Sequence, residues 1–331
     1  MSAIPAPATP GPHPLRRPGD ALPRASIGTV PILWNNVDLV DLAPQVDPET
    51  ILDEIARTGF EGTQEGRGFP RGAALRQALA ARGLSLAEVY ASLRCATDGP
   101  LPGALETARE RLRVLHDGGG DVLVAALDTS PERSRIAGRA ANAGAPQLTG
   151  AGWRSLGETV DRLAEETVSA GHSFAWHPHA ATYVETPAEV ERFAAITDPM
   201  LVGICLDVGH YIVGGGDPVA ALGRYGERVT HLHLKDVDPA VLDGLRSGAI
   251  PDFEAAIRER LFTELGNGCL DLGGVLAALA ARDYAGWLMV EQDSSWGPPS
   301  ESAAIGRRVL AAELRRLGAD PGRASAPREQ P

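Results

Sequence analysis

Cysteine is scarce in this chain, and its scarcity limits the class of protein. Only Cys95, Cys205 and Cys269 occur among 331 residues. Three scattered cysteines are too few for a disulfide framework, and none has the spacing of a structural zinc motif. We therefore expect a cytoplasmic protein.

An excess of positive charge and long apolar runs are lacking as well. The net charge of -12 argues against binding of nucleic acid, because that binding depends on Lys and Arg neutralising phosphates. No run approaches the roughly 18 to 20 apolar residues that a membrane span needs, and the N-terminus has no apolar signal core. These absences predict a soluble globular protein with neither a nucleic-acid nor a membrane partner.

The chain also lacks a glycine-rich phosphate loop after its first predicted strand, residues 27–34, where NNVDLVDL follows instead. This disfavours a doubly wound open sheet. Eight short apolar runs alternate with helical stretches, which predicts a single (β/α)₈ TIM barrel over residues 26–317. We expect an insertion at about 237–268 with a helix near 252–261, and disordered tails at 1–25 and 318–331.

The predicted strands place ionisable side chains at one end of the barrel. These strands are 27–34, 60–64, 84–93, 121–127, 173–179, 202–210, 229–236 and 286–293. The helices between them are 48–58, 73–82, 105–116, 155–170, 187–196, 218–225, 272–282 and 302–317. The last four strands end in His, Asp, Lys or Glu. Because parallel strands of one barrel deliver their C-terminal ends to the same face, we expect one shared pocket there.

The seventh predicted strand is the most informative of these. Alternation sends His231, His233 and Lys235 to one side of it, towards the barrel interior. Three polar groups on that face are costly to bury unless they bind a ligand or a metal. This favours a functional site over a packed core.

Its neighbours supply further donors, each with a plainer alternative. Asp207 ends the sixth strand and His210 follows it in DVGH; alone, Asp207 fits a helix cap and His210 a loop residue equally well. Glu291 ends the eighth strand, where a salt-bridge partner is the commoner role of a glutamate.

The fifth strand leaves three candidates for a fourth donor, His177, His179 and Glu185. Such an oxygen-rich mixture with imidazole suits Mn²⁺ or Co²⁺, with Mg²⁺ as a further candidate. No organic cofactor is required.

Six stretches carry a family resemblance across nearly the whole predicted barrel. They are Gly59–Pro70, Ala175–Phe193, Leu206–Leu222, Arg228–Arg246, Phe262–Leu279 and Tyr284–Asp293. In combination, HPH followed by VET, then DVGH and HLHLKDV, resemble the inosose dehydratases of inositol catabolism, within the xylose-isomerase-like barrel superfamily.

The resemblance implies a role for particular residues. It implies a divalent ion held by Glu185, Asp207, His233 and Glu291. It further implies proton transfer by catalytic residues and contacts of others with a small cyclitol or sugar substrate. The catalytic candidates are Glu185, Glu291, His177 and Lys235, and the substrate-binding candidates are His179, His210, Trp34, Asn35 and Gln64. Barrels of this type often form homo-oligomers.

The activity that the resemblance implies is a metal-dependent dehydration. Water would leave a keto-cyclitol, scyllo-inosose (2-keto-myo-inositol) or a close analogue, through a metal-stabilised enediolate. Gln64 stands where the family pattern has Glu, which suggests a modified cyclitol or aminocyclitol ketone. An isomerase or epimerase is the alternative, since it shares the first half-reaction. A metal-dependent phosphodiesterase and a non-catalytic sugar-binding barrel are less favoured.

Overall fold

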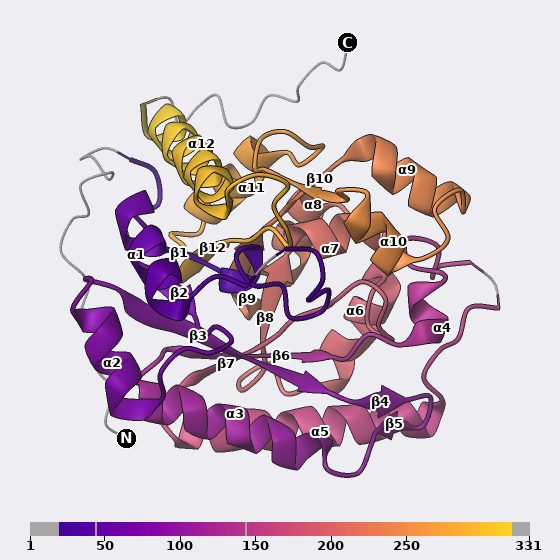
Figure 1. Ribbon diagram of the computed structural model, residues 1–331. Coiled ribbons are helices and arrows are strands. Elements are labelled where there is room, and N and C mark those ends of the chain that lie inside the picture. Colours follow the sequence, from indigo (N-terminus) through magenta and orange to yellow (C-terminus); the bar gives the residue numbers. More distant parts are fainter. Residues whose placement is uncertain (1–19, 44, 143, 320–331) are drawn as a thin grey trace.

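Eight parallel strands close into a barrel in the computed structural model, which describes residues 20–43, 45–142 and 144–319 (Figure 1). The barrel strands are β1 (Ser26–Thr29), β2 (Gly62–Gln64), β3 (Ser85–Leu93), β6 (Val122–Leu127), β7 (Ser173–Trp176), β8 (Gly203–Asp207), β9 (Val229–Leu234) and β12 (Trp287–Val290). They are ordered β1-β12-β9-β8-β7-β6-β3-β2, and β1 also pairs with β2, which closes the ring. The predicted TIM barrel is confirmed.

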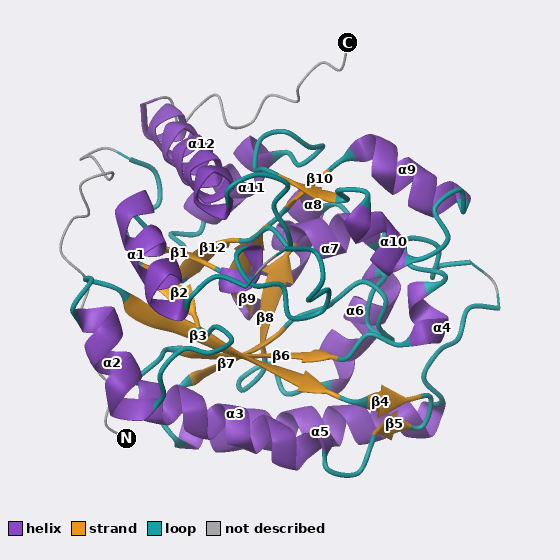
Figure 2. Ribbon diagram, in the orientation of Figure 1, coloured by secondary structure: helices purple, strands orange, loops and turns teal. Residues whose placement is uncertain are grey.

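Helices surround the strands (Figure 2). They are α1 (Pro48–Thr58), α2 (Gly72–Ala80), α3 (Ala104–Gly118), α4 (Pro131–Ser134), α5 (Gly150–Ser169), α6 (Pro187–Ile196), α7 (Val208–Val213), α8 (Pro218–Tyr225), α11 (Leu272–Ala280) and α12 (Pro299–Ala319). Caps define several starts: the Asp47 carboxylate accepts from two backbone N–H groups of α1, and Thr186 forms a capping box with Glu189 at α6. Among the described residues, no helix is both long and apolar enough to cross a membrane.

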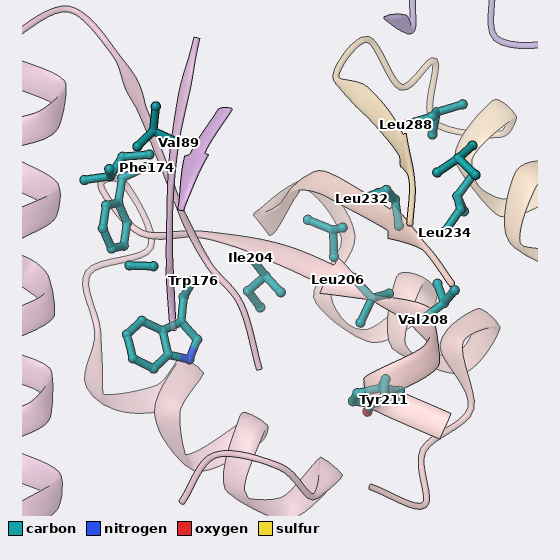
Figure 3. Close-up of a cluster of buried hydrophobic side chains, with 14 of the residues drawn as sticks. Val89, Phe174, Trp176, Ile204, Leu206, Val208, Tyr211, Leu232, Leu234 and Leu288 are labelled. Carbon is teal, nitrogen blue, oxygen red and sulfur yellow. The ribbon is translucent and has the colours of Figure 1, made fainter. Parts of the chain in front are cut away.

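The main apolar core lies between the barrel and the helices. Outward residues of neighbouring strands form it, including Ile204, Leu206, Leu232 and Leu234 (Figure 3). Trp176 stacks on Phe193 of α6 with ring centroids 4.5 Å apart. Because these residues face outwards, the residues that alternate with them face the barrel interior. This alternation puts the polar tips of β7, β8 and β9 inside.

The insertion after β9 has its own small core. It contains β10 (Asp236–Val237), α9 (Pro239–Ser247), α10 (Phe253–Arg258) and β11 (Phe262–Thr263), and β10 pairs with β11 in antiparallel fashion. Leu245, Phe253, Ile257 and Phe262 belong to its buried cluster. The sequence predicted one helix in this insertion, and the structure contains two.

Several predicted strands end earlier than expected. β1 stops at Thr29, and the 3₁₀ helix η1 (Pro31–Leu33) follows, because Pro31 has no N–H for a strand ladder. β8 stops at Asp207, whose side chain caps α7, so His210 lies on a helix instead of a strand. Two further short strands, β4 (Cys95–Ala96) and β5 (Gly99–Pro100), form a hairpin outside the barrel, and the 3₁₀ helix η2 (Gly226–Arg228) precedes β9.

The expected tails fall mostly outside the described residues, which exclude 1–19 and 320–331. Residues 20–25 do not fit the predicted tail. Leu22 and Ala25 are buried, and Ala21 N–H donates to the Leu314 carbonyl of α12 at 3.0 Å. At the other end, α12 includes residues 318 and 319, so this helix extends two residues beyond the predicted boundary.

Candidate metal centre and active site

Four side chains meet where β7, β8, β9 and β12 end. His177 directly follows β7, Asp207 is the last residue of β8, His233 lies in β9, and Glu291 directly follows β12. Strand pairing sets their places, because Asp207 lies opposite His233 in the register of β8 and β9. Glu291 joins the same level, since its N–H donates to the Leu234 carbonyl at 3.1 Å.

These four residues form a compact cluster. One donor atom from each lies within 4.8 Å of all the others. His233 Nδ1 is 2.6 Å from Glu291 Oε2 and 3.9 Å from Asp207 Oδ2, and His177 Nε2 is 3.5 Å from Asp207 Oδ2. His177, Asp207 and His233 are buried, and the Glu291 side chain is only 9% exposed.

The cluster fits a divalent cation. Asp207 Oδ2, His233 Nδ1 and Glu291 Oε2 are buried and have no hydrogen-bond partner among the described residues, whereas buried polar atoms are normally paired. A neutral His233 that donates from Nε2 to Glu88 Oε2 at 3.0 Å turns its Nδ1 lone pair towards Glu291. Two acceptor atoms so close need a cation or a proton between them. Two carboxylates and two imidazoles suit first-row divalent metals.

Lys235 is the positive charge beside this cluster. Its Nζ lies 2.6 Å from Asp293 Oδ1, 3.1 Å from Glu291 Oε1 and 3.5 Å from Asp207 Oδ2. Against the effect of burial, these carboxylates raise the pKa of Lys235 well above its ordinary value. Lys235 is therefore protonated in the free enzyme and can act as a donor at the site.

The structure does not place Glu185 in the cluster, and this corrects the ligand and catalytic roles expected for it. Its Oε1 accepts from Gly138 N–H at 2.8 Å and its Oε2 from Ala181 N–H at 2.7 Å. The loop after β7 turns at Ala181, which has a φ of 64°. The Glu185 carboxylate stabilises this turn through its hydrogen bond with the Ala181 N–H. His177 takes the fourth position instead.

A cavity of about 430 Å³ opens above the cluster. His177, His233, Lys235 and Glu291 line its floor. Its wall carries polar side chains from the first half of the barrel, namely Asn35, Asp38, Gln64, Arg67, Tyr90 and Asp128. The volume lies within the range of small-molecule sites.

The expected substrate contacts divide into two groups. Gln64, Asn35 and His179 line the cavity, although the Asn35 amide also exchanges two hydrogen bonds with the Val46 backbone. Trp34 is a wrong prediction, because its buried indole Nε1 donates to Glu54 Oε2 at 2.6 Å and the ring faces α1. His210 does not line the cavity either.

His210 instead lies behind the cavity floor. Its Nδ1 accepts from Ala180 N–H at 3.3 Å, and its Nε2 lies 3.0 Å from Lys235 Nζ. The ring lies against His179, with centroids 3.7 Å apart and the ring planes tilted by 33°. His210 is therefore placed to support Lys235 and His179, not to touch a substrate.

Sequence reasoning missed three residues of the site, Glu88, Tyr90 and Asp293. Glu88 is fully buried and contacts His231 and His233. The signal for it was a single carboxylate on the inward face of an apolar strand, two residues before Tyr90. Asp293, the close partner of Lys235, lies two residues after Glu291 and shows the same alternation.

Comparison with known proteins agrees with this architecture. The profile of the xylose isomerase-like TIM barrel family matches residues 52–313. Inosose dehydratase of Geobacillus kaustophilus (strain HTA426) is 33% identical over 296 residues, covering 86% of this chain and 93% of that protein. Rhizopine catabolism protein MocC of Rhizobium meliloti is 35% identical over 295 residues, covering 88% and 89%. Among solved structures, L-ribulose 3-epimerase superposes with a TM-score of 0.67 at 17% identity, covering 93% of this chain and all of that one.

The chain belongs to the xylose isomerase-like TIM barrel family, and the expected resemblance to the inosose dehydratases within it is confirmed. Inosose dehydratases are carbon–oxygen lyases, and the chain is an enzyme of this class. Together the relatives and the fold support a ketocyclitol dehydratase or a sugar isomerase or epimerase.

Proposed function

We propose that the protein is a divalent-metal-dependent dehydratase of a ketocyclitol, with scyllo-inosose or a close analogue as its substrate. The observation that carries this proposal is the set of four donor atoms from His177, Asp207, His233 and Glu291, which all lie within 4.8 Å of one another. Of these residues, His177, His233 and Glu291 also line the cavity. The identity of 31–35% with curated relatives, most of them named inosose dehydratase, supports the same activity.

His177, Asp207, His233 and Glu291 would hold the ion. A divalent cation there supplies a Lewis acid that favours negative charge on a ketone oxygen and its neighbouring hydroxyl. Gln64, Asn35, Asp38 and Tyr90 can bind and orient the remaining ring hydroxyls from the cavity wall. A single hydrogen-bonded pose of the ring would place its α-carbon over the floor, where the proton-transferring groups lie.

We assign proton transfer to two residues that line the cavity. His179 Nδ1 is 2.6 Å from the Ala180 carbonyl, so this nitrogen carries the proton and Nε2 keeps a lone pair. His179 Nε2 is therefore the proposed acceptor of the α-proton. Lys235 Nζ, held by Asp293 and Glu291, is the proposed donor to the departing β-hydroxyl.

In this scheme, removal of the α-proton forms an enediolate. The β-carbon–oxygen bond then breaks, and the hydroxyl leaves as water with a proton from Lys235. The product is the enol of a 1,2-dione. Isomerisation would instead return the proton to carbon without breaking that bond.

Incubation of the purified protein with Mn²⁺ and scyllo-inosose tests the proposal. We expect ultraviolet absorbance of an enone or dione and a product lighter by one water molecule in mass spectrometry. The Asp207→Asn variant, which loses one ligand charge, is expected to give neither signal. A new ketocyclitol of unchanged mass would replace the dehydratase by an isomerase.

A further inference from the structure

A buried carboxylate lies beneath the proposed metal ligands and takes no direct part in the scheme above. Glu88 of β3 has no solvent-exposed surface. Its Oε2 accepts from His233 Nε2 at 3.0 Å and also contacts His231 Nε2. Both histidines belong to β9, which is separated from β3 by three other strands in the barrel order. The contact therefore crosses the barrel interior.

Stability alone does not explain this arrangement. A buried ionic group is usually no more stabilising than well-packed apolar residues of similar volume. Val122, Val124, Cys205 and Met289 of the barrel strands belong to one buried apolar cluster. Glu88 Oε2 contacts both imidazoles, whereas Glu88 Oε1 has no hydrogen-bond partner among the described residues.

The chemistry of imidazole suggests what the Glu88 carboxylate does. A carboxylate only accepts hydrogen bonds, so each histidine must present an N–H to Glu88. For His233 this places a proton on Nε2 and directs Nδ1 towards Asp207 and Glu291. A metal-binding histidine commonly donates its second N–H to a carboxylate, which fixes the ring and raises its basicity.

We propose that Glu88, held in place by His231, is a positioning residue that orients His233 for the divalent ion and strengthens it as a ligand. This inference rests on the proposed metal site. Among the described residues, Glu88 is the only side chain that hydrogen-bonds to His231, at Nε2, since the His231 Nδ1 has no partner there. His231 therefore donates from Nε2, and this second hydrogen bond holds the Glu88 carboxylate between the two rings.

The test compares Glu88→Gln with two variants of His231. Mn²⁺ affinity is measured by calorimetry, and the His233 ring N–H is observed by NMR in ¹⁵N-labelled, metal-free protein. We expect Glu88→Gln to weaken Mn²⁺ binding by about 10- to 100-fold and to shift the His233 Nε2–H resonance. His231→Leu should weaken binding less, and His231→Gln, which can still donate to Glu88, should restore it.

Glu61→Gln is the matched control, because Glu61 is a buried glutamate whose Oε2 accepts from the Ile27 backbone and lies away from the site. It should leave Mn²⁺ affinity unchanged. If wild type binds Mn²⁺ and the Glu88 and His231 variants bind it within twofold of wild type, the role of Glu88 is wrong while the metal site stands. If wild type itself binds no divalent ion, the proposed function fails, and the role of Glu88 as a metal-ligand support fails with it.

Discussion

At the residue scale, Asp207 combines two roles through its two oxygens. Oδ1 accepts from His210 N–H at 2.8 Å and caps α7, while Oδ2 faces the cluster. One side chain thus ends a strand, starts a helix and presents a ligand atom. Substitutions can separate these roles, because an amide keeps an acceptor oxygen and loses the charge.

Asp207→Asn and Asp207→Ala are therefore expected to differ in stability and to agree in function. Both should abolish high-affinity Mn²⁺ binding. Metal-free Asp207→Ala should be less stable than Asp207→Asn by about 1 kcal/mol, the usual contribution of a helix cap. Urea unfolding of both metal-free variants measures the difference, and equal stability would argue against the capping role.

Glu185 provides a prediction on pH. Burial raises its pKa to about 7, with Arg133 and two backbone N–H groups opposing the shift and Glu189 adding to it. Between the ordinary pKa of glutamate and 7, the folded protein keeps a proton that the unfolded chain has lost. The free energy of unfolding therefore falls as pH rises through this window.

Glu185→Gln removes this titration. Relative to wild type, the variant should gain up to about 3 kcal/mol in unfolding free energy between pH 5 and pH 8. The quantity to measure is the difference between the two proteins at each pH, which cancels the titrations that they share. A difference that does not change with pH would contradict a raised pKa.

The sequence predicted some of these residues better than others, for a geometric reason. Inside a strand, alternation determines the side that each residue faces, so His233 and Lys235 were placed correctly towards the interior. Glu185 lies in a loop, where spacing along the chain carries no direction, and it faces Ala181 instead of the cavity. Glu88 was missed because its partners lie on a strand that is distant in sequence.

At the element scale, one buried carboxylate attaches the two ends of the insertion to each other. Asp236 accepts from the N–H groups of Val237, Gly266, Gly268 and Leu270 at 2.8–3.1 Å. The insertion also borders the active site, because Phe253 of α10 lies against His179 with ring centroids 6.0 Å apart. Loss of these hydrogen bonds should therefore disturb the position of His179 in the cavity.

Asp236→Ala leaves four backbone donors without this acceptor, those of Val237 and Leu270 being buried, and should destabilise the protein by about 2 kcal/mol or more. Hydrogen exchange should rise at residues 262–270, and the KM should increase. Asp238→Ala is the control, since Asp238 only caps α9 and its loss should cost about 1 kcal/mol without faster exchange at 262–270. Equal exchange in the two variants would contradict the attachment.

Helix bounds were predicted well where a cap and a proline coincide, as at α1, α6 and α8, whose residues match the expectation. The ends of β1 and β8 were predicted too late, because the apolar run of each strand continues into the following helix, η1 or α7. Periodicity cannot show where a buried strand becomes a short buried helix. Helix α9 of the insertion was missed although Asp238 and Pro239 mark its start in the same way.

At the scale of the whole molecule, the alternation of strands and helices was sufficient to predict the barrel, and its closure places all four proposed ligands on one face. Ion binding by the native state alone should then stabilise the entire fold. At a Mn²⁺ concentration 100 times its Kd, the free energy of unfolding should rise by about 2.7 kcal/mol. Thermal unfolding with Mn²⁺ and after chelation measures this, and Asp207→Asn should show no increase.

The proposed metal ligands and the residues of the cavity wall come from different halves of the chain. The proposed ligands, Lys235 and Asp293 all lie within residues 177–293. The wall residues from Val30 to Thr129 lie in or after the first four strands of the barrel. Specificity can therefore evolve in one half of the polypeptide while the reactive chemistry is inherited unchanged in the other. A change of substrate would then require substitutions only among the residues of the cavity wall.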